Sequence, residues 1–184
     1  LRKGIAVRRA RHDELAEICH EVCLRTARRL RVDDGDLKHL AFALQTYDLG
    51  LSGVPDEVLY KSPPLEPEEW EIIQQHVHTG LEMVEHLDAD EMVKESILHH
   101  HEHYDGSGYP NGLAGDSIPF GARLLALADA LTAMLQGRPY RPALQLRDAL
   151  SEMSERSGSQ FCPRCLAVFL EEAREFEEAV AAIQ

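Results

Sequence analysis

Hydrophobic residues recur every three or four positions along most of the chain, and runs of alternating β-branched residues are missing. A spacing of three or four places apolar side chains on one face of a helix, whereas a half-buried strand needs a period of two. The pattern therefore predicts an all-α fold. The expected helices cover about residues 12–30, 37–50, 55–59, 67 onward, 89–100 and 119 onward, with two more at the C-terminal end.

Local signals indicate where several of these helices begin and end. Pro67 and the two glutamates after it are typical of a helix start, because proline suits the first position and acids suit the positive end of the helix dipole. Gly50 is expected to end the second main helix, which would put Asp48 in its last turn. The four glycines and the proline between 106 and 115 predict a long loop, and Pro119 opens the most apolar helix.

Composition and charge narrow the classes of function. The 184 residues include 32 acidic and 19 basic ones, which gives a formal net charge of −13. Such a surface argues against a nucleic-acid polymer or an anionic membrane as partner. No apolar run approaches the roughly 18 residues of a membrane span, so we expect a cytoplasmic protein. Because the chain begins at Leu1 instead of methionine, we expect it to be a piece of a longer protein or a protein whose start is not seen here.

The four cysteines favour reduced thiols, because four are too few for a disulfide framework in a chain of this size. Cys162 and Cys165 have the spacing of a zinc knuckle, but Cys19 and Cys23 lie far upstream. A structural zinc site stays open as the alternative.

The segment "HHHEHYDGSGYP", from His99 to Pro110, holds four histidines and two carboxylates in its first seven residues. Each buried imidazole nitrogen needs a partner, and a metal ion can serve several of them at once. His100 and His101 are adjacent, so both rings can turn to one point only at the end of a helix. His76 lies on the apolar face of another helix, where it is either a ligand or an ordinary core histidine.

Asp129 lies within the most apolar helix, inside the run "LLALADAL". A carboxylate buried there would cost several kcal/mol unless it is paired or bound to a metal ion. Two explanations are open at this point, a metal ligand and a buried ion pair with an arginine.

The stretch "HHEHYDGSGYPNGLAGDSIPFGARLLALADALTAMLQGRPYR", with "GVPDEVLYKSPPLEPEEWEIIQQHVHTG" before it and "SGSQFCP" after it, resembles the HD-GYP domain. These are bacterial metal-dependent phosphohydrolases that linearise and hydrolyse cyclic di-GMP, and the resemblance covers about residues 37–170. It implies an HD-domain-like bundle of seven to eight helices with a long GYP loop. It also divides the chain into an N-terminal helical segment, residues 1–36, that belongs to the bundle or links it to an upstream domain, and an HD-GYP-like domain, residues 37–184.

The resemblance implies metal ligands at five positions, and two of the five, Asp48 and Asp129, are also implied to be catalytic. The five positions are Asp48, His76, His100, His101 and Asp129. Members of the family hold two metal ions that share the aspartate of the His-Asp pair. One or two divalent ions are therefore expected here. Iron or manganese is favoured for three imidazoles and a carboxylate, with zinc or nickel as alternatives.

Three positions depart from the family pattern. Tyr47 stands in place of the paired histidine, Leu51 in place of a lysine, and Leu15 lies near the position of a first-helix histidine, for which His12 is a possible substitute. Tyr47 is either packed against the site or a phenolate ligand, although a pKa near 10 makes phenol a poor ligand at neutral pH. The departures imply a degenerate centre with weak or absent turnover, or a non-catalytic cyclic di-GMP sensor or partner-binding module.

Three further residues match positions with roles in the family. Arg138 and Arg141 match substrate-binding positions, and arginine forks suit phosphate; surface arginines are the alternative. Tyr109 matches the exposed tyrosine implicated in docking to GGDEF-type diguanylate cyclase domains; a tyrosine that fixes the loop is the alternative. Cyclic di-GMP is the expected small-molecule partner.

Overall fold

The computed structural model describes residues 2–61, 64–137 and 142–184, with side chains from residue 13 onward. Within these ranges the regular secondary structure is helical, which confirms the predicted all-α class. The elements in chain order are α1 (Arg2–Arg29), α2 (Asp34–Thr46), η1 (Leu49–Gly53), α3 (Asp56–Leu59), α4 (Pro67–Gln74), α5 (His76–Glu85), α6 (Glu91–His99), η2 (Gly115–Ser117), α7 (Phe120–Gln136), α8 (Leu146–Glu155), α9 (Pro163–Arg174) and α10 (Glu177–Ile183).

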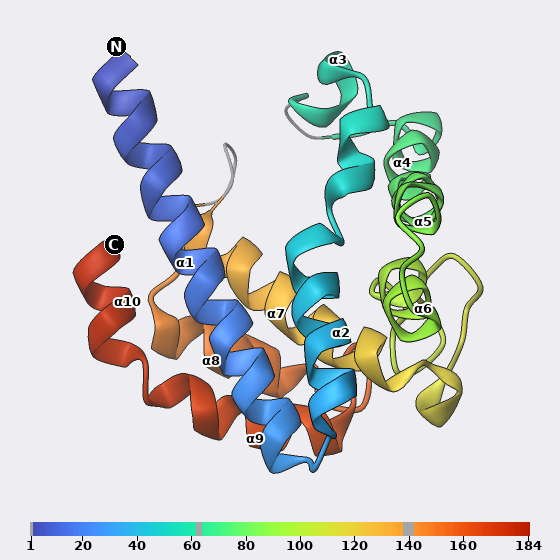
Figure 1. Cartoon of the computed structure of the whole chain (residues 1–184). Helices are drawn as coiled ribbons and strands as arrows, with labels where there is room; N and C mark the ends of the chain where they lie inside the picture. The colour runs from blue at the N-terminus through green and yellow to red at the C-terminus, as the bar shows by residue number, and fades with distance from the viewer. Residues whose placement is uncertain (1, 62–63, 138–141) are drawn as a thin grey trace.

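Helix α7 is the centre of the bundle. It packs against α1, α2, α6, α8 and α9, and its leucines and alanines are buried on several sides. A helix that is apolar around most of its circumference is stable only when other helices cover it. In Figure 1, α1 crosses α7, and α2 lies between α1 and the pair α5–α6.

Helix α1 supplies part of the same core. Its buried face includes Leu15, Cys19, Val22, Cys23 and Ala27, and it packs against α7, α9 and α2. The division of the chain at residue 36 stays a prediction. None of the helices in the described ranges is long and apolar enough to cross a bilayer.

The long helix expected after Pro67 is two helices, α4 and α5, with a break at Gln75. The break has a visible cause, because the ring of His76 bonds the carbonyl oxygen of Ile73 through Nδ1 at 2.6 Å. A side chain that takes a carbonyl of the preceding turn interrupts the regular ladder. The C-terminal region likewise ends in a third helix, α10, which begins after Phe176.

The second main helix ends earlier than expected. α2 stops at Thr46, Tyr47 is its C-cap, and Asp48 precedes the 3-10 helix η1 with φ −91° and ψ 2°. Asp48 is therefore in a turn between two helices and is exposed, not in the last turn of a helix that continues to Gly50.

Gly50 lets η1 lie directly against α5. A Cβ at Gly50 would lie 1.9 Å from the carbonyl oxygen of His76 and 2.6 Å from the nitrogen of Gly80, distances that no side chain tolerates. Glycine is thus required here by the close approach of two backbones. The contact holds the turn that carries Tyr47 and Asp48 against the start of α5.

Candidate metal centre

Three imidazole side chains from two helix ends meet in the structure. His76 begins α5, His100 is the C-cap of α6, and His101 follows it. Each offers a nitrogen, and these ligand atoms all lie within 4.8 Å of one another. The ring centroids of His100 and His101 are 4.0 Å apart, and that of His76 is 5.1 Å from His101. The helix end thus allows two adjacent histidines to turn to one point.

The hydrogen bonds of two of these rings leave one nitrogen of each without a partner. Nδ1 of His76 bonds Ile73 O, and Nδ1 of His100 bonds Ile97 O, both at 2.6 Å. A ring that donates from Nδ1 carries its lone pair on Nε2. The Nε2 atoms of His76 and His100 are buried and have no hydrogen-bond partner, which is costly unless something binds them. The arrangement fits a metal ion, because a carbonyl oxygen that bonds the other ring nitrogen orients a ligand histidine.

The protonation state of the rings also suits metal binding. Burial lowers the pKa of His76 below its ordinary value, and it lowers the pKa of His100 to about 3. Both rings are neutral at pH 7 in the folded chain. Neutral imidazole is the form that ligates a metal ion.

Tyr47 lies beside His100 and interacts with the carboxylates of Asp129 and Asp48. Its ring meets the ring of His100 edge-on with centroids 5.3 Å apart, and its hydroxyl donates to Oδ1 of Asp129 at 3.3 Å. Burial, followed by the charges of Asp129 and Asp48, raises the pKa of the Tyr47 phenol far above its ordinary value. The hydroxyl therefore stays protonated at neutral pH, so Tyr47 is not a phenolate.

The two aspartates expected as ligands lie next to the imidazole group but outside it. Among the described residues, the group whose ligand atoms all lie within 4.8 Å of one another consists of the three histidines and does not include Asp48 or Asp129. Asp129 is half-buried instead of fully buried. Three of the four groups expected around one ion thus meet in the structure, and Asp48 remains a predicted ligand.

A cleft of about 470 Å³ opens beside His100 and His101. Asp129 and small residues of α7 line it, together with Trp70 of α4 and the neighbouring Arg156 and Gln160. A substrate bound in this cleft would touch the histidines directly.

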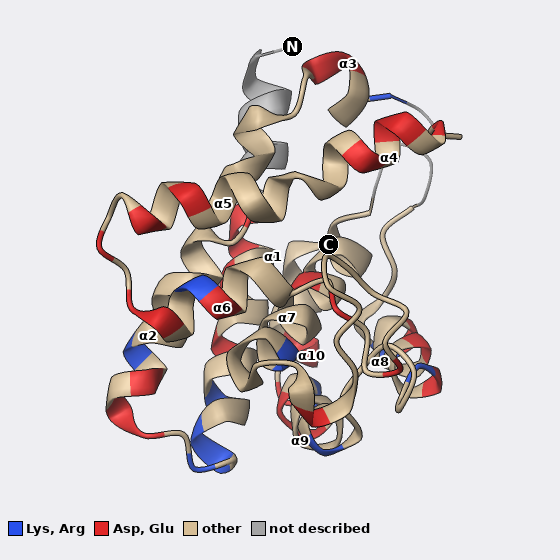
Figure 2. Ribbon diagram, turned by 90° about the vertical axis from the view of Figure 1, so that its right-hand side faces the viewer, with Lys and Arg blue, Asp and Glu red and all other residues tan. Residues whose placement is uncertain are grey.

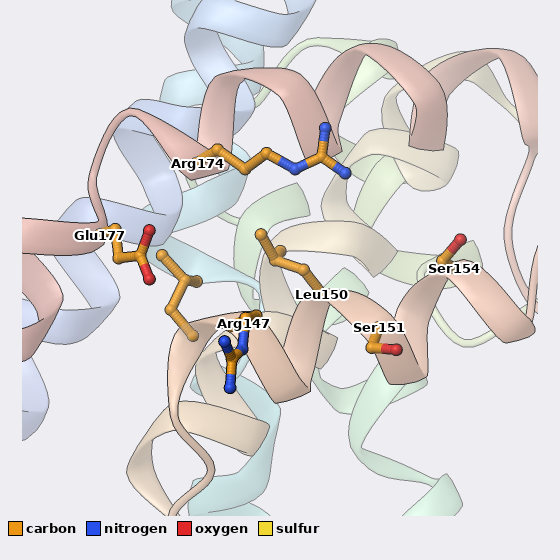
Figure 3. Close-up of a pocket in the computed structure, with 7 residues that line it drawn as sticks. Arg147, Leu150, Ser151, Ser154, Arg174 and Glu177 are labelled. Atoms are coloured by element: carbon orange, nitrogen blue, oxygen red, sulfur yellow. The ribbon is translucent and has the colours of Figure 1, made fainter.

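A second cleft, of about 400 Å³, lies between α8 and the α9–α10 segment. Figure 3 shows Arg147 and Arg174 on opposite sides of it, with Ser151 and Ser154 on α8. No imidazole lines this cleft, so it is separate from the candidate metal centre.

The distribution of charge affects access to the first cleft. Figure 2 shows acidic residues along α4 and α5, whereas basic residues gather at the C-terminal end of α1. An anionic ligand is therefore repelled by much of this surface, and Arg156 is a local positive group on the cleft wall.

Tyr109 is half-buried and stacks on a site histidine. Its ring lies 4.9 Å from that of His101 at an angle of 24°, and its backbone nitrogen donates to His101 O at 3.2 Å. Tyr109 thus fixes the loop to the end of α6, and its role in partner binding stays a prediction.

Some of the expected site positions lie outside the described residues, and others carry side chains that cannot bind a metal ion or a phosphate. Arg138 and Arg141 lie outside the described residues, and so does the side chain of His12. Leu15 is buried in the apolar core with only 3% exposure, so the position nearest the family's first-helix histidine has no ligand. Leu51 is half-buried in η1 and carries no charge.

Glu102 is a site residue that sequence reasoning missed. Its side chain is fully buried, and its two oxygens accept hydrogen bonds from Asn111 N at 2.7 Å and Leu113 N at 3.0 Å. It thereby ties the loop after His101 back to the end of α6. A glutamate directly after two adjacent histidines was the available signal, but its loop partners follow only from the fold.

The cysteines are free and buried, as expected of thiols. Burial raises the pKa of Cys19 to about 12. Within the part of the chain that the structure describes, the four cysteines do not form a group with ligand distances. The zinc alternative therefore has no support in the fold.

The fold and the three imidazoles define an all-helical protein with a group of three histidines that could hold a metal ion. Residues 1–164 match the family model described as "HD domain". Because the match covers most of the chain, the chain belongs to the HD domain family.

Curated relatives are similar over much of this chain. A cyclic di-GMP phosphodiesterase of Thermotoga maritima is 33% identical over 156 residues, which are 84% of this chain and 42% of that protein. A 3'3'-cGAMP-specific phosphodiesterase 2 of Vibrio cholerae is also 33% identical, over 84% of this chain and 30% of its own length. The chain thus spans less than half the length of these relatives.

Solved structures share the fold. A cyclic GMP-AMP specific phosphodiesterase of V. cholerae superposes with a TM-score of 0.68 and 21% identity, over 93% of this chain and 46% of the other. A HDG"Y"P protein of Bdellovibrio bacteriovorus gives a TM-score of 0.68 with 18% identity, over 87% of this chain and 51% of the other. At these identities the likeness shows the helical arrangement alone.

Proposed function

We propose that this chain is an HD-GYP-type phosphohydrolase domain that binds one divalent metal ion and acts on or binds cyclic di-GMP, with weak or absent turnover. One observation carries the proposal. The buried Nε2 atoms of His76 and His100 have no partner, and these two rings and that of His101 each offer a nitrogen within 4.8 Å of the others. Ordinary packing gives no reason to leave two such atoms unpaired beside a third imidazole.

The three imidazoles would hold the ion, and Asp48 is proposed as its fourth ligand. The second carboxylate, Asp129, is proposed as a ligand of any second ion. Both aspartates interact with the hydroxyl of Tyr47. The ring of Tyr47 in turn contacts the ring of His100, so Tyr47 links both carboxylates to the imidazole group. We favour iron or manganese for this set, with zinc or nickel as alternatives.

A divalent ion bound here would polarise a phosphoryl oxygen and lower the pKa of a bound water molecule. The chain's own residues orient the ligands. Carbonyl oxygens of Ile73 and Ile97 fix the rings of His76 and His100, and Glu102 fixes the loop that follows His101. Tyr47 donates a hydrogen bond to Asp129, which occupies one lone pair of that carboxylate.

The substrate assignment is supported by the relatives, which are named as phosphodiesterases of cyclic di-GMP or of 3'3'-cGAMP. The cleft beside the histidines places a bound ligand next to His100, His101 and Asp129. Arg138 and Arg141 are proposed to contact the phosphates. Four free cysteines are in keeping with the cytoplasm as the compartment.

Weak turnover is proposed because three ligand or substrate positions carry unsuitable side chains. Tyr47 stays protonated, Leu15 is buried in the core, and Leu51 supplies no charge to a phosphate. Each change weakens the binding of a second metal ion or the binding of an anionic substrate.

The alternative is a non-catalytic module that senses cyclic di-GMP or binds a protein, with Tyr109 and the GYP loop as the contact for a GGDEF-type domain. The protonated Tyr47 favours this alternative, because it removes a metal ligand without disturbing the three histidines.

Metal analysis of the purified chain tests the proposal. We expect about one ion of iron, manganese, zinc or nickel per chain, and less than a tenth of that in His100→Ala. The matched control is His78→Ala, because His78 lies exposed two residues from His76 and outside the group. Equal metal in all three proteins would overturn the metal centre.

Incubation with cyclic di-GMP and excess iron(II) or manganese(II) separates the two functions. Slow release of pGpG or GMP supports the enzyme. Binding of the nucleotide without product supports the sensor, and neither binding nor product would contradict the substrate assignment.

A further inference from the structure

The cleft beside the histidines extends beyond the metal centre, and part of its wall has no role in holding a metal ion. Trp70, Arg156 and Gln160 line this part, over a floor made by alanines of α7. These residue types are the ones that bind nucleobases: an aromatic ring, a guanidinium and an amide.

Trp70 is a large aromatic residue that is exposed and does not pack in the core. It is the only tryptophan of the chain and has 49% of its surface exposed. No residue of α4 is buried, so the indole does not anchor this helix to the core. α4 is instead fixed by a capping box between Glu66 and Glu69 and by the ion pair of Lys61 with Glu69 at 2.6 Å. An indole on a fixed helix beside a cleft offers a flat face at low entropic cost.

Arg156 is held in place by its neighbours. Its Nη2 donates to Glu152 Oε1 at 2.7 Å, and its Nη1 donates to Gln160 Oε1 at 2.9 Å. The segment after Arg156 is also bonded to the histidine loop, because Tyr104 N donates to Gln160 O at 3.1 Å. The guanidinium is therefore fixed in position relative to His101, and its remaining N–H groups are available to a ligand.

The floor between these walls is made by α7, with three alanines and Met134. Ala126, Ala130 and Ala133 are spaced by four and three residues, so they share one face of α7, and all three are partly exposed in the cleft. An apolar surface of this kind, with three alanines beside a methionine, can accept a planar ring.

We propose that this part of the cleft is a guanine-binding subsite, in which the indole of Trp70 stacks on one base of a cyclic dinucleotide and Arg156 bonds its edge. The inference rests on the proposed function and adds a base preference to it. Guanine presents two acceptors, O6 and N7, to an arginine, whereas adenine presents a donor at N6. Arg156 therefore favours cyclic di-GMP over cyclic di-AMP.

Fluorescence of the only tryptophan reports the contact directly. Cyclic di-GMP should quench the emission of the unmodified chain in a saturable way, with the same Kd as calorimetry gives. Base stacking contributes a free energy that corresponds to about a 5- to 150-fold change in affinity, so Trp70→Ala should weaken binding by at least fivefold, and Trp70→Phe should weaken it less.

The arginine is tested by base preference. Arg156→Ala should weaken cyclic di-GMP at least fivefold and change the Kd of cyclic di-AMP less than twofold. Tyr60→Ala and Arg147→Ala are matched controls, because Tyr60 is 73% exposed and lines no described cleft near the histidines, and Arg147 lies in the other cleft. Circular dichroism checks that each variant is folded, and both targets are exposed enough to replace.

The outcomes separate this inference from the proposed function. Unchanged affinity in Trp70→Ala and Arg156→Ala, with unmodified protein that binds cyclic di-GMP, overturns the subsite and leaves the proposed function standing. Unmodified protein that binds no cyclic dinucleotide overturns both.

Discussion

The hydroxyl of Tyr47 donates a hydrogen bond to Oδ1 of Asp129, 3.3 Å away, from a segment that lies 82 positions earlier in the chain. The tyrosine thus occupies the space between a carboxylate and the ring of His100. It satisfies the carboxylate as a hydrogen-bond donor, because burial and two nearby negative charges keep the phenol protonated.

Replacing Tyr47 with histidine should restore a ligand at this point. A neutral imidazole binds divalent ions at pH 7, whereas a protonated phenol does not. We expect Tyr47→His to raise the metal content from about one to about two ions per chain and to raise the rate of cyclic di-GMP hydrolysis at least tenfold. Elemental analysis and product chromatography measure the two effects.

The control for this change is Tyr47→Phe, which removes the hydrogen bond to Asp129 and adds no ligand. It should keep the metal content of the unmodified chain and lower the free energy of unfolding by about 1 kcal/mol. A single ion in Tyr47→His would show that Tyr47 is not what limits the second site.

Gly50→Ala should separate η1 from α5. The new Cβ would lie 1.9 Å from His76 O and 2.6 Å from Gly80 N. Both atoms belong to the backbone of α5, so they cannot move without shifting the helix that carries His76. We expect a loss of about 3 kcal/mol in the free energy of unfolding, measured by urea denaturation, and a weaker metal affinity.

Gly53→Ala is the matched control within the same 3-10 helix. Its Cβ would meet the side-chain Cγ2 atom of Thr79 at 3.3 Å, which a small rotation relieves. Its effect should stay within about 1 kcal/mol. Equal losses in the two variants would contradict the tight contact at Gly50.

Glu102→Ala should release the loop after α6. The substitution leaves the amides of Asn111 and Leu113 without their buried acceptor. Hydrogen bonds to a charged group contribute about 1.5–3 kcal/mol each, so we expect a loss of about 3 kcal/mol and faster hydrogen exchange at these two amides.

Glu95→Ala is the comparison for Glu102. Glu95 is half-exposed and lies 3.5 Å from Nε2 of His99, and such a pair contributes little. Its removal should change the free energy of unfolding by less than about 1 kcal/mol and leave the exchange of the loop amides unchanged. Slow exchange at both amides in Glu102→Ala would mean that other contacts hold the loop.

The folded chain should lose stability in mild alkali. Burial raises the pKa of Cys19 from 9.0 to about 12, so between these values the unfolded chain releases a proton that the folded chain keeps. Stability is therefore present below about pH 9 and falls as the pH rises. The free energy of unfolding should drop by about 1.4 kcal/mol for this thiol between pH 8 and pH 10.

Urea denaturation in the presence of reductant, at both pH values, measures this drop. Cys19→Ala should lower the total pH dependence by that amount, whatever its effect on stability at pH 8. An unchanged pH dependence in the variant would show that Cys19 already ionises in the folded chain.

The sequence by itself determined the helical class and selected the candidate metal ligands. The apolar period of three to four and the helix starts at Pro67 and near Pro119 depend on neighbours in the chain, so they can be predicted locally. The density of histidines after His99 likewise indicated a metal centre, and the order of motifs indicated the family.

Only the tertiary structure decided which groups meet. The convergence of His76 with His100 and His101 depends on the packing of α5 against α6, and the pairing of Tyr47 with Asp129 depends on α7. The turn after α2 lies directly against the start of α5 at Gly50, a contact between segments that sequence spacing does not bring together. Long-range packing, which no local pattern encodes, thus placed Asp48 at an exposed turn and gave Trp70 a place on the wall of the cleft.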